Sequence, residues 1–472
     1  MDSHGEAAKR RIVVDNLHGD VELTEQEWRV VNTATFQRLR WLKQLGMGHL
    51  VYPNATHSRF AHSLGVFAIM RRIVRKLDDR TPKPKDSDVE NLRLAALLHD
   101  VGHYPYSHLM ERVDAVQLTE EEVQKDGKRT LSAALETYPD HETLGRHILE
   151  TQKDIQEAIG GAERAKEIGS LFSRAEGTDP QLSKLIHSSL DMDRLDYLLR
   201  DARASGVPYG EIDLNYLLNN IRISPSGVLG VEYKALAAAE HFLLARLFMH
   251  RVVYYHKSIF GFEEACRQLL RRVRDAGKYE MPSDGAAVVK LAMGSGLLSF
   301  TDDYVDQIIR RAAADGDRVI SGLARCITNR RAPKLLAEVS GLQKKGDDFH
   351  AGNLFRTRCK AELPALATKY GLPVGLFLLC GPKPIKVEER GPLFTRDEAK
   401  KLQPEEREEL IKVFQPGGNE PSSIVEIDRS LTKHLSDHPF GIHRLYVVDD
   451  DQDAAKRLPE LRKAAQQWTK PG

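Results

Sequence analysis

The chain has 472 residues, of which 69 are basic and 68 acidic, and its formal net charge is +1. That balance excludes a polyelectrolyte surface for non-specific binding to nucleic acids or membranes, so local basic residues would have to meet a small anionic substrate. The 41% hydrophobic and 29% charged residues are typical of a soluble globular protein with two or three domains, or with one large helical body and an appendage.

The cysteines and the N-terminus indicate the compartment. Cys266, Cys326, Cys359 and Cys380 are widely spaced and form no CxxC motif, which is typical of reduced cysteines in a cytosolic protein. The first residues lack the apolar core of a signal peptide, and the chain contains no run of about eighteen apolar residues. We therefore expect a cytoplasmic protein without a membrane partner.

The first third of the chain is predicted to form a β-hairpin followed by helices. Residues 1–10 are polar and are expected to be a disordered tail. Strand-like runs flank a turn at His18-Gly19, and Thr24 with Glu27 matches a capping box that opens a helix. The hairpin is predicted at 11–15 and 20–23, helices at about 25–32, 35–45, 58–77 and 87–100, and a polar insertion that could act as a lid at 113–137.

The rest of the chain is predicted to be helical to residue 372 and mixed beyond it. Helices are expected at about 142–158, 163–174, 180–203, 233–276 with a break near Ser258, and 285–371, with a second hairpin at 221–223 and 228–231. Strand-like runs at 374–379, 423–427 and 445–448 alternate with helical stretches at 396–413 and 453–468. The expected fold is mainly α, with a helical domain over 11–372 that includes small β-hairpins, and a small α+β C-terminal lobe over 373–472.

One predicted helix ends in two adjacent side chains that favour metals. Leu94, Leu97 and Leu98 give an apolar i, i+3, i+4 stripe, which predicts a buried helix that runs directly into His99 and Asp100. Burying a histidine beside an aspartate is costly unless both are satisfied, and a bound cation would satisfy them. A His–Asp hydrogen bond that closes the helix is the alternative, and this stretch taken alone favours it.

Two further metal-capable residues, His62 and Asp193, lie on separate predicted helices. With His99 and Asp100 they make a set of two imidazoles and two carboxylates, which suits iron, manganese, zinc or a related divalent ion. Four protein ligands leave room for water on a six-coordinate metal, and such water ionises near neutral pH. Each of these residues taken singly is more often structural than catalytic.

The order H…HD…D and the longer words around it resemble the HD phosphohydrolase superfamily. The words are FQRLR (36–40), KQLG (43–46), HSRFAHSLGV (57–66), LHDVGH (98–103) and DMDRLDY (191–197). They are similar to those of the deoxynucleoside triphosphate triphosphohydrolases, a family that includes dGTPase-like enzymes and the catalytic core of the vertebrate SAM-and-HD-domain dNTPase. The resemblance covers residues 11–257 and implies an HD-domain helical bundle. Because it begins almost at residue 11, we expect no SAM domain.

The resemblance also implies a reaction. His62, His99, Asp100 and Asp193 would hold a divalent ion, either Fe, Mn, Zn or Mg, and a second Mg²⁺ would accompany the triphosphate of a dNTP substrate. Water would attack the α-phosphorus and release the deoxynucleoside and inorganic triphosphate. The alternatives are another HD-type nucleotide phosphohydrolase, such as a nucleotidase or a single-strand nuclease, and a non-catalytic nucleotide sensor. The near-zero net charge argues against a nuclease.

The resemblance assigns the proton chemistry to further residues. His103, His108 and His141 match the family's other active-site histidines, and Glu111 follows His108 by three residues. On one short helix the Glu111 carboxylate could orient the His108 imidazole and raise its pKa. The family match makes His108 the acid that protonates the departing 5′ oxygen, with His141 assisting.

Further matched residues would bind the substrate. The resemblance implies phosphate contacts from planar guanidinium groups and one hydroxyl, a site for the 3′-hydroxyl, and an aromatic wall that excludes ribonucleotides. The phosphate residues are Arg59, Arg194, Arg246 and Tyr197; the sugar residues are Gln44, Asp201, Leu45 and, at the 2′ position, Tyr254.

Departures from the family pattern affect the expected regulation. Asn32 stands where the vertebrate enzyme has a guanine-reading aspartate, and Val14 replaces a polar neighbour, so guanine-nucleotide activation of that kind is not expected. Gln37 and Arg40 do match, which leaves room for some activator nucleotide. The family forms oligomers with nucleotides between subunits, so we expect a homo-oligomer, a dimer or a tetramer, and no nucleic-acid partner.

Overall fold

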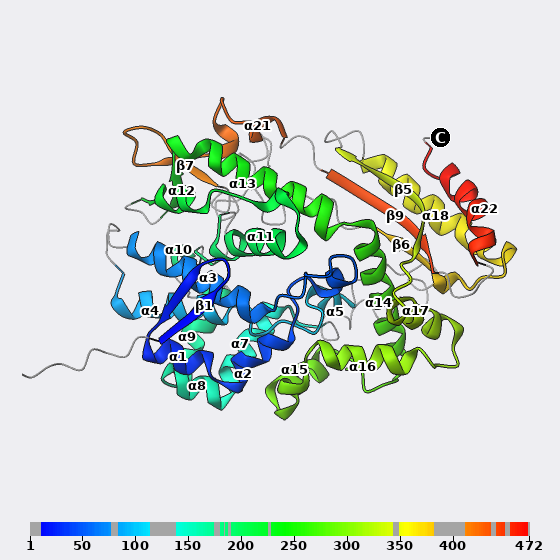
Figure 1. Ribbon diagram of the computed structural model, residues 1–472, viewed down its shortest axis with the longest axis horizontal. Coiled ribbons are helices and arrows are strands. Elements are labelled where there is room, and N and C mark those ends of the chain that lie inside the picture. Colours follow the sequence, from blue (N-terminus) through cyan, green and yellow to red (C-terminus); the bar gives the residue numbers. More distant parts are fainter. Residues whose placement is uncertain are drawn as a thin grey trace, which may run out of the picture.

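The computed structural model describes residues 11–76, 84–113, 138–173, 180–183, 185–186, 190–224, 228–342, 349–381, 411–435, 440–448 and 454–470. The fold is mainly α with small sheets, which confirms the predicted class (Figure 1). The tail expected at 1–10, almost the whole insertion at 113–137 and most of the helix at 396–413 lie outside the described residues. Within the described ranges, no helix is long and apolar enough to cross a lipid bilayer.

The N-terminal half contains the predicted hairpin and most of the predicted helices. Thr24 and Glu27 form the expected capping box, in which each side chain accepts a hydrogen bond from the backbone N–H of the other residue. The elements are β1 (Arg11–Asp15), β2 (Gly19–Leu23), α1 (Glu25–Val31), α3 (Arg59–Val74), α4 (Asp86–Leu98), α5 (His108–Glu111), α7 (His141–Thr151), α8 (Lys153–Ile159), α9 (Ala162–Ser173), α10 (Pro180–Ser183), α11 (Met192–Ser205) and α12 (Leu214–Asn219).

The helix predicted at about 35–45 is shorter than expected. α2 (Ala34–Gln37) passes into a 3₁₀ turn at Arg38–Trp41, and Leu42 is already extended. The cause is a tertiary contact, because the buried Arg38 guanidinium donates hydrogen bonds to three distant carbonyl oxygens, including that of His103. This contact ties the segment to the loop that follows the HD pair.

The long helix predicted at 233–276 is interrupted close to its expected break. α13 (Leu236–Met249) and α14 (Lys257–Asp275) are joined by a π-helical segment, His250–Tyr254. π-helical segments occur often at functional sites. This segment places the predicted sugar residue Tyr254 beside α11.

The predicted helical stretch at 285–371 was wrong at one point. After α15 (Gly285–Met293), α16 (Asp302–Ala312) and α17 (Arg318–Thr328), the chain forms a strand, β5 (Lys334–Leu342), before α18 (Phe349–Lys369). β5 pairs antiparallel with β9 (Phe440–Val447), which also pairs with β6 (Phe377–Cys380). The partner strand lies about a hundred residues further along the chain, so local periodicity could not reveal it. α22 (Ala454–Gln467) packs on β5 (Figure 1).

A second sheet also joins distant parts of the chain. The second hairpin, β3 (Ile221–Ile223) and β4 (Leu229–Glu232), is extended by β7 (Lys412–Phe414), which runs parallel to β4, and by β8 (Pro421–Ser423). Residues 424–426, predicted as strand, form a 3₁₀ turn. Strand pairing therefore crosses residue 373 in both sheets, and the expected domain boundary there stays a prediction.

Helices α3 and α11 approach closely at Gly65, in the middle of α3. A Cβ atom at this position would lie 1.9 Å from Asp196 Oδ1 and 2.4 Å from Arg200 Nη2. The absence of a side chain therefore allows the carboxylate of Asp196 to reach the α3 backbone. This contact sets the distance between the two helices that carry His62 and Asp193.

Gly65→Ala should lower the free energy of unfolding by about 2–3 kcal/mol, because the overpacked methyl group outweighs the higher helix propensity of alanine. Gly316→Ala is the matched control, since nothing lies within 4 Å of its added Cβ, and its effect should stay below about 1 kcal/mol. Urea unfolding of both variants measures the difference. Equal stabilities would contradict the close approach at Gly65.

Candidate active site

The structure brings the four predicted metal residues together. His62 comes from α3, His99 and Asp100 follow α4, and Asp193 lies in the first turn of α11. The ligand atoms of His62, His99 and Asp100 all lie within 4.8 Å of one another. Asp193 Oδ1 is 2.9 Å from His62 Nε2 and 3.9 Å from His99 Nε2. Three helices therefore converge on one mixed nitrogen and oxygen cluster.

A buried carboxylate orients His62. His62 Nδ1 donates to Asp196 Oδ2 at 2.8 Å, so its Nε2 points at the cluster. The other oxygen of Asp196 accepts from His18 Nε2 at 2.6 Å, and Arg200 donates to both oxygens. The sequence interpretation assigned no role to His18 or Asp196. The spacing of Asp196 from Asp193, one helical turn, was the available signal, whereas nothing local singled out the turn residue His18.

The cluster fits a divalent cation. His99 Nδ1 donates to the carbonyl oxygen of Ala96 at 2.9 Å, and its Nε2 is buried without a hydrogen-bond partner. Burial opposes protonation of His62, but hydrogen bonds to Asp193 and Asp196 outweigh it and raise its pKa to about 10. The proton between His62 and Asp193 thus balances carboxylate charge that a metal ion could balance instead.

Arg59 is engaged with a candidate metal ligand. Its Nη1 donates to Asp100 Oδ2 at 2.6 Å, and its Nε and Nη2 donate to Ser107 Oγ. Burial raises the pKa of Asp100, but the charge of Arg59 and the neighbouring histidines hold it well below the usual range. Arg59 therefore orients Asp100 here, and its expected phosphate contact stays a prediction.

A second cluster holds the histidines expected to move protons. His103 stacks on His141 with ring centroids 3.9 Å apart, and His108 packs edge-on against both rings. Glu111 accepts from His108 Nδ1 at 2.6 Å and from His141 Nδ1 at 3.2 Å. His103 Nε2 lies 3.1 Å from Asp100 Oδ1. The second cluster thus adjoins the metal cluster through His103.

The pKa values of His141 and His108 in this cluster are shifted in opposite directions. Burial lowers the pKa of His141, but Glu111 outweighs it and leaves that pKa raised. For His108, burial outweighs Glu111, and the charges of His141 and Arg112 also lower the pKa. The expected hydrogen bond between His108 and Glu111 is therefore present, whereas the expected rise of the His108 pKa was wrong. The proton is more stable on His141.

One side of α11 carries residues that are predicted to bind the metal, the phosphates and the sugar. Asp193, Tyr197 and Asp201 are spaced by four residues, so they lie along one stripe of the helix. Asp201 is buried and accepts from His57 Nε2 at 2.8 Å and from the Tyr254 hydroxyl at 2.7 Å.

Gln44 and Leu45, the other predicted sugar residues, are only partly buried. Leu45 packs against the main hydrophobic core. Gln44 Oε1 is buried without a hydrogen-bond partner, although the residue as a whole is half-buried. The side chain thus keeps an acceptor that a ligand hydroxyl could satisfy.

Two arginines interact electrostatically on the side of α11 that faces α13. Burial, followed by the charge of Arg194, lowers the pKa of Arg246. Arg246 Nε and Nη1 are buried and have no hydrogen-bond partner. Burial of His250, together with the charges of Arg246 and Arg194, lowers the pKa of His250 to about 3. Arg194 Nη1 lies 3.8 Å from Asp191 Oδ2, whereas the two buried N–H groups of Arg246 could still donate to an anion, which fits the predicted phosphate role of Arg246.

The residues that match the family's activator site lie at the surface. Val14 is 78% exposed on β1, and Asn32 and Arg40 are exposed as well. Arg40 stacks over the Phe60 ring and donates to Gln37 Oε1 at 2.6 Å. An activator nucleotide at these residues stays a prediction.

Comparison with known families agrees with this geometry. Residues 59–201 match the HD domain, and residues 212–291 match the HD associated region. The HD match begins at Arg59 and ends at Asp201, so it includes all four metal residues and both histidine clusters. The chain thus carries the domain that defines the HD phosphohydrolases, a class of metal-binding hydrolases.

Two individual relatives show how far the sequence similarity extends. An uncharacterized protein of Bacillus subtilis, YwfO, is 29% identical over 338 residues, which cover 70% of this chain and 72% of that protein. Bovine deoxynucleoside triphosphate triphosphohydrolase SAMHD1 is 39% identical over 121 residues, which cover 24% of this chain and 20% of that enzyme. Several other relatives are matched over about half of their length.

A solved structure shares the fold. The crystal structure of a phosphohydrolase from Bacteroides thetaiotaomicron superposes with a TM-score of 0.66 at 22% identity and covers 93% of this chain and 100% of that one. At this identity the likeness concerns the fold alone.

Asp193→Ala should remove most of the metal that the purified protein retains. Changing even an outer partner of a metal ligand typically costs about 10–100-fold in affinity, so losing a ligand should cost at least about 100-fold. Asp303→Ala, on α16 with a side chain 65% exposed, is the matched control. Elemental analysis after dialysis measures the metal content. Equal metal content in the two variants would place the metal elsewhere.

The raised pKa of His141 predicts a pH-dependent contribution to stability. A histidine whose pKa is higher in the folded state stabilises fully below its unfolded pKa of about 6.5, and this contribution is lost as the pH rises through the folded pKa. The stability difference between the wild type and His141→Gln should therefore be larger at pH 6 than at pH 9. Urea unfolding at both values measures it. His147→Gln, on the same helix, is the control, and a pH-independent difference would contradict protonation of His141.

Proposed function

We propose that the protein hydrolyses deoxynucleoside triphosphates to deoxynucleoside and inorganic triphosphate. The observation that carries the proposal is the arrangement along α11. Asp193 lies in the metal cluster, Arg194 adjoins Arg246, whose Nε and Nη1 lack hydrogen-bond partners, and Asp201 meets Tyr254 two turns further on. One helix thus carries groups suited to a metal, a phosphate chain and a sugar.

The metal would be held by His62, His99, Asp100 and Asp193. When bound, a divalent cation supplies Lewis acidity toward a phosphate oxygen and promotes the ionisation of water. The donor set suits Fe, Mn or Zn best, with Mg also possible in oxygen-rich coordination. Asp196 keeps His62 Nε2 turned toward this position, and Arg59 does the same for Asp100.

His108, Glu111 and His141 would supply the proton that the reaction needs. Water adds to the α-phosphorus, the bond to the 5′ oxygen breaks, and that oxygen takes up a proton. The raised pKa of His141 keeps a proton there near neutral pH, and Glu111 links it to the more exposed His108. Positioned acid groups of this kind typically contribute about 10²–10⁴-fold in rate.

Arg194, Arg246 and Tyr197 would bind the triphosphate. Nε and Nη1 of Arg246 are buried without acceptors, and phosphate oxygens would satisfy them with bidentate, charge-assisted hydrogen bonds. Neutralising the phosphate chain also removes the repulsion between Arg194 and Arg246. Substrate binding would thus relieve an unfavourable interaction between two charges of the free protein.

Asp201, Gln44 and Tyr254 would select the deoxyribose. Asp201 and Gln44 offer buried acceptor oxygens to a 3′-hydroxyl. The Tyr254 ring is held in place because its hydroxyl donates to Asp201 and its ring packs against His250. A fixed aromatic wall would exclude a 2′-hydroxyl by sterics. The partial similarity to SAMHD1, whose name states this activity, supports the proposal.

Regulation is part of the proposal. An activator nucleotide would bind at the exposed Gln37–Arg40 pair, and a second copy of the chain would complete that site. Trp41, which directly follows Arg40 and is 69% exposed, and Val14 on β1, which is 78% exposed, provide apolar surface for such a contact. A dimer or tetramer would therefore be the active form.

The test is a product analysis with each dNTP and each ribonucleotide, alone and in pairs, in the presence of Mn²⁺ or Mg²⁺. We expect deoxynucleoside and inorganic triphosphate in equal amounts from dNTPs, and at least about a hundredfold less from ribonucleotides, since steric exclusion of this kind costs several kcal/mol. Chromatography separates the products. Deoxynucleoside monophosphate or orthophosphate as the product would instead support a nucleotidase.

The Asp193→Ala variant supplies the control for this assay. It should lose turnover while remaining folded at the assay temperature, because its side chain is one-third exposed. Asp303→Ala should retain full turnover. If Asp193→Ala retained activity, the hydrolysis would not depend on the metal cluster. If the wild type were inactive toward every nucleotide, a nucleotide sensor would be favoured.

A further inference from the structure

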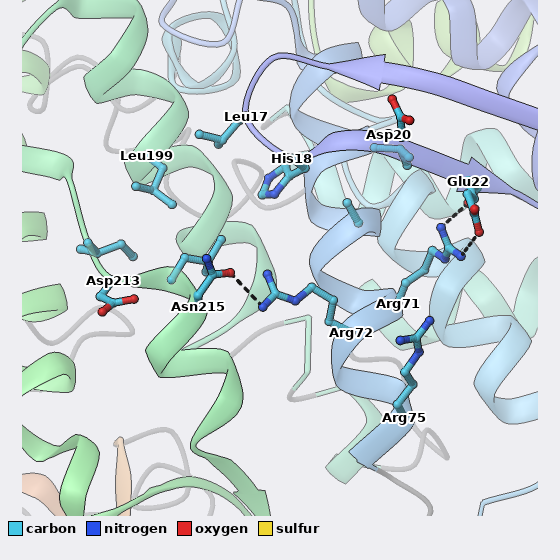
Figure 2. A pocket seen from close by; sticks show the side chains of 14 residues that line it. Leu17, His18, Asp20, Glu22, Arg71, Arg72, Arg75, Leu199, Asp213 and Asn215 are labelled. Carbon is cyan, nitrogen blue, oxygen red and sulfur yellow. Dashed lines mark hydrogen bonds and ion pairs between the residues drawn. The ribbon is translucent and has the colours of Figure 1, made fainter.

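A cavity of about 610 Å³ lies apart from the metal cluster, on the other side of His18. It is bounded by the turn between β1 and β2, by the second half of α3, by α11 and by the start of α12 (Figure 2). From His62 to Arg71, α3 rises about 14 Å along its axis, so the cavity is not part of the metal site. Its size is in the range of pockets for small organic ligands.

Three arginines line one wall of the cavity: Arg71 and Arg72 in the last turn of α3, and Arg75, which caps its C-terminal end. Arg71 donates to the backbone oxygen and the carboxylate of Glu22, so its charge is balanced. Arg72 donates to Asn215 Oδ1 at 3.1 Å, a neutral amide that leaves the charge uncompensated. Figure 2 shows the side chain of Arg72 extending from α3 across to Asn215.

Arg75 adds a second uncompensated charge. Among the residues that the structure describes, it takes part in no hydrogen bond or ion pair, and its side chain is exposed at the cavity. Arg72 and Arg75 are also spaced i, i+3, which places like charges on neighbouring turns and is unfavourable without an anion. The burial of Arg72 lowers its pKa, in keeping with a guanidinium that lacks a carboxylate partner.

The acidic residues of the cavity do not cancel these charges. Glu22 is already paired with Arg71, and Asp213 caps α12 by accepting from Tyr216 N–H at 2.9 Å. Figure 2 shows the carboxylate of Asp20 pointing away from the arginine side chains. Besides His18 and Asn215, the lining includes the apolar side chains of Leu17, Val21, Ala68, Leu199, Ile212 and Leu214.

We propose that this cavity binds a phosphorylated small molecule, with its phosphate held by Arg72 and Arg75 and its less polar part against the apolar wall. Guanidinium groups form bidentate hydrogen bonds with phosphate oxygens, and two of them on adjacent turns suit one phosphate group. The phosphate could belong to a nucleotide or to free inorganic phosphate or triphosphate. All of these share the chemistry that the arginines recognise.

The cavity has a direct connection to the metal cluster. His18 lines the cavity, and its Nε2 lies 2.6 Å from Asp196 Oδ1, while Asp196 Oδ2 accepts from His62 Nδ1. A ligand that moves His18 therefore changes the hydrogen bonding of the carboxylate that orients His62. Binding in the cavity would alter turnover through this chain of contacts, and this part of the inference rests on the proposed function.

Calorimetric titration of the full-length, metal-free protein tests the binding. The probes are inorganic phosphate, inorganic triphosphate and a deoxynucleoside monophosphate. Arg72→Ala/Arg75→Ala should weaken binding of at least one probe by about tenfold or more, because charge-assisted hydrogen bonds to two guanidinium groups are lost. Arg246→Ala should leave this binding event unchanged.

The matched control is Lys290→Ala/Arg310→Ala, which removes two positive charges from exposed positions of α15 and α16, outside the cavity lining. It should bind the probes as the wild type does. Equal binding by the cavity variant and this control, or no binding of any probe to the wild type, would overturn the proposal. Which probe binds most tightly distinguishes a nucleotide from a free phosphate.

The coupling is tested by dNTP turnover with the best probe at saturation. The probe should change the turnover of the wild type and of the control variant at least about twofold. It should leave the turnover of the Arg72→Ala/Arg75→Ala variant unchanged. An unchanged rate in the wild type would overturn the coupling. Because calorimetry needs no turnover, failure of the proposed function leaves the binding result intact, and failure of binding leaves the hydrolysis result intact.

Discussion

Asp196 joins three segments of the chain at one buried carboxylate, and the arrangement of the metal cluster depends on it. It accepts from His62 of α3 and from His18 of the hairpin turn, and Arg200 donates to both of its oxygens. In a buried network of this kind, removing one partner leaves the others charged and unsatisfied. The contact is possible because Gly65 allows α11 to approach α3. A packing detail thereby sets where His62 points.

Helix α11 connects the regions of the candidate site. Its first turn supplies Asp193 to the mixed histidine and aspartate cluster, and the next residue, Arg194, adjoins the buried Arg246. The separation of the two charge types along one rigid helix fits a substrate that carries both a metal-binding phosphate and an extended anionic chain. Such preorganisation lowers the cost of ordering the site at binding. The cavity near Arg72 adds a second cationic region beyond His18.

Much of the candidate site could be predicted from the sequence because its parts are short and local. The stripe of Leu94, Leu97 and Leu98 predicted a buried helix ending at His99, and the structure has that helix. The capping box and the first hairpin were also predicted correctly. By contrast, the pKa of His108 was wrongly predicted to rise, because desolvation, together with the charges of His141 and Arg112, outweighs the effect of Glu111.

The sequence by itself indicated which residues could bind a metal or move a proton, through their side-chain chemistry and through the resemblance of its motifs to those of HD phosphohydrolases. Only the tertiary structure decided that Arg59 is paired with Asp100, that His18 reaches Asp196, and that β5 is a strand. Each of these depends on a partner far away in the chain, so no local periodicity encodes it. Contacts across such distances form only when the packing of the whole core fixes where the partners lie.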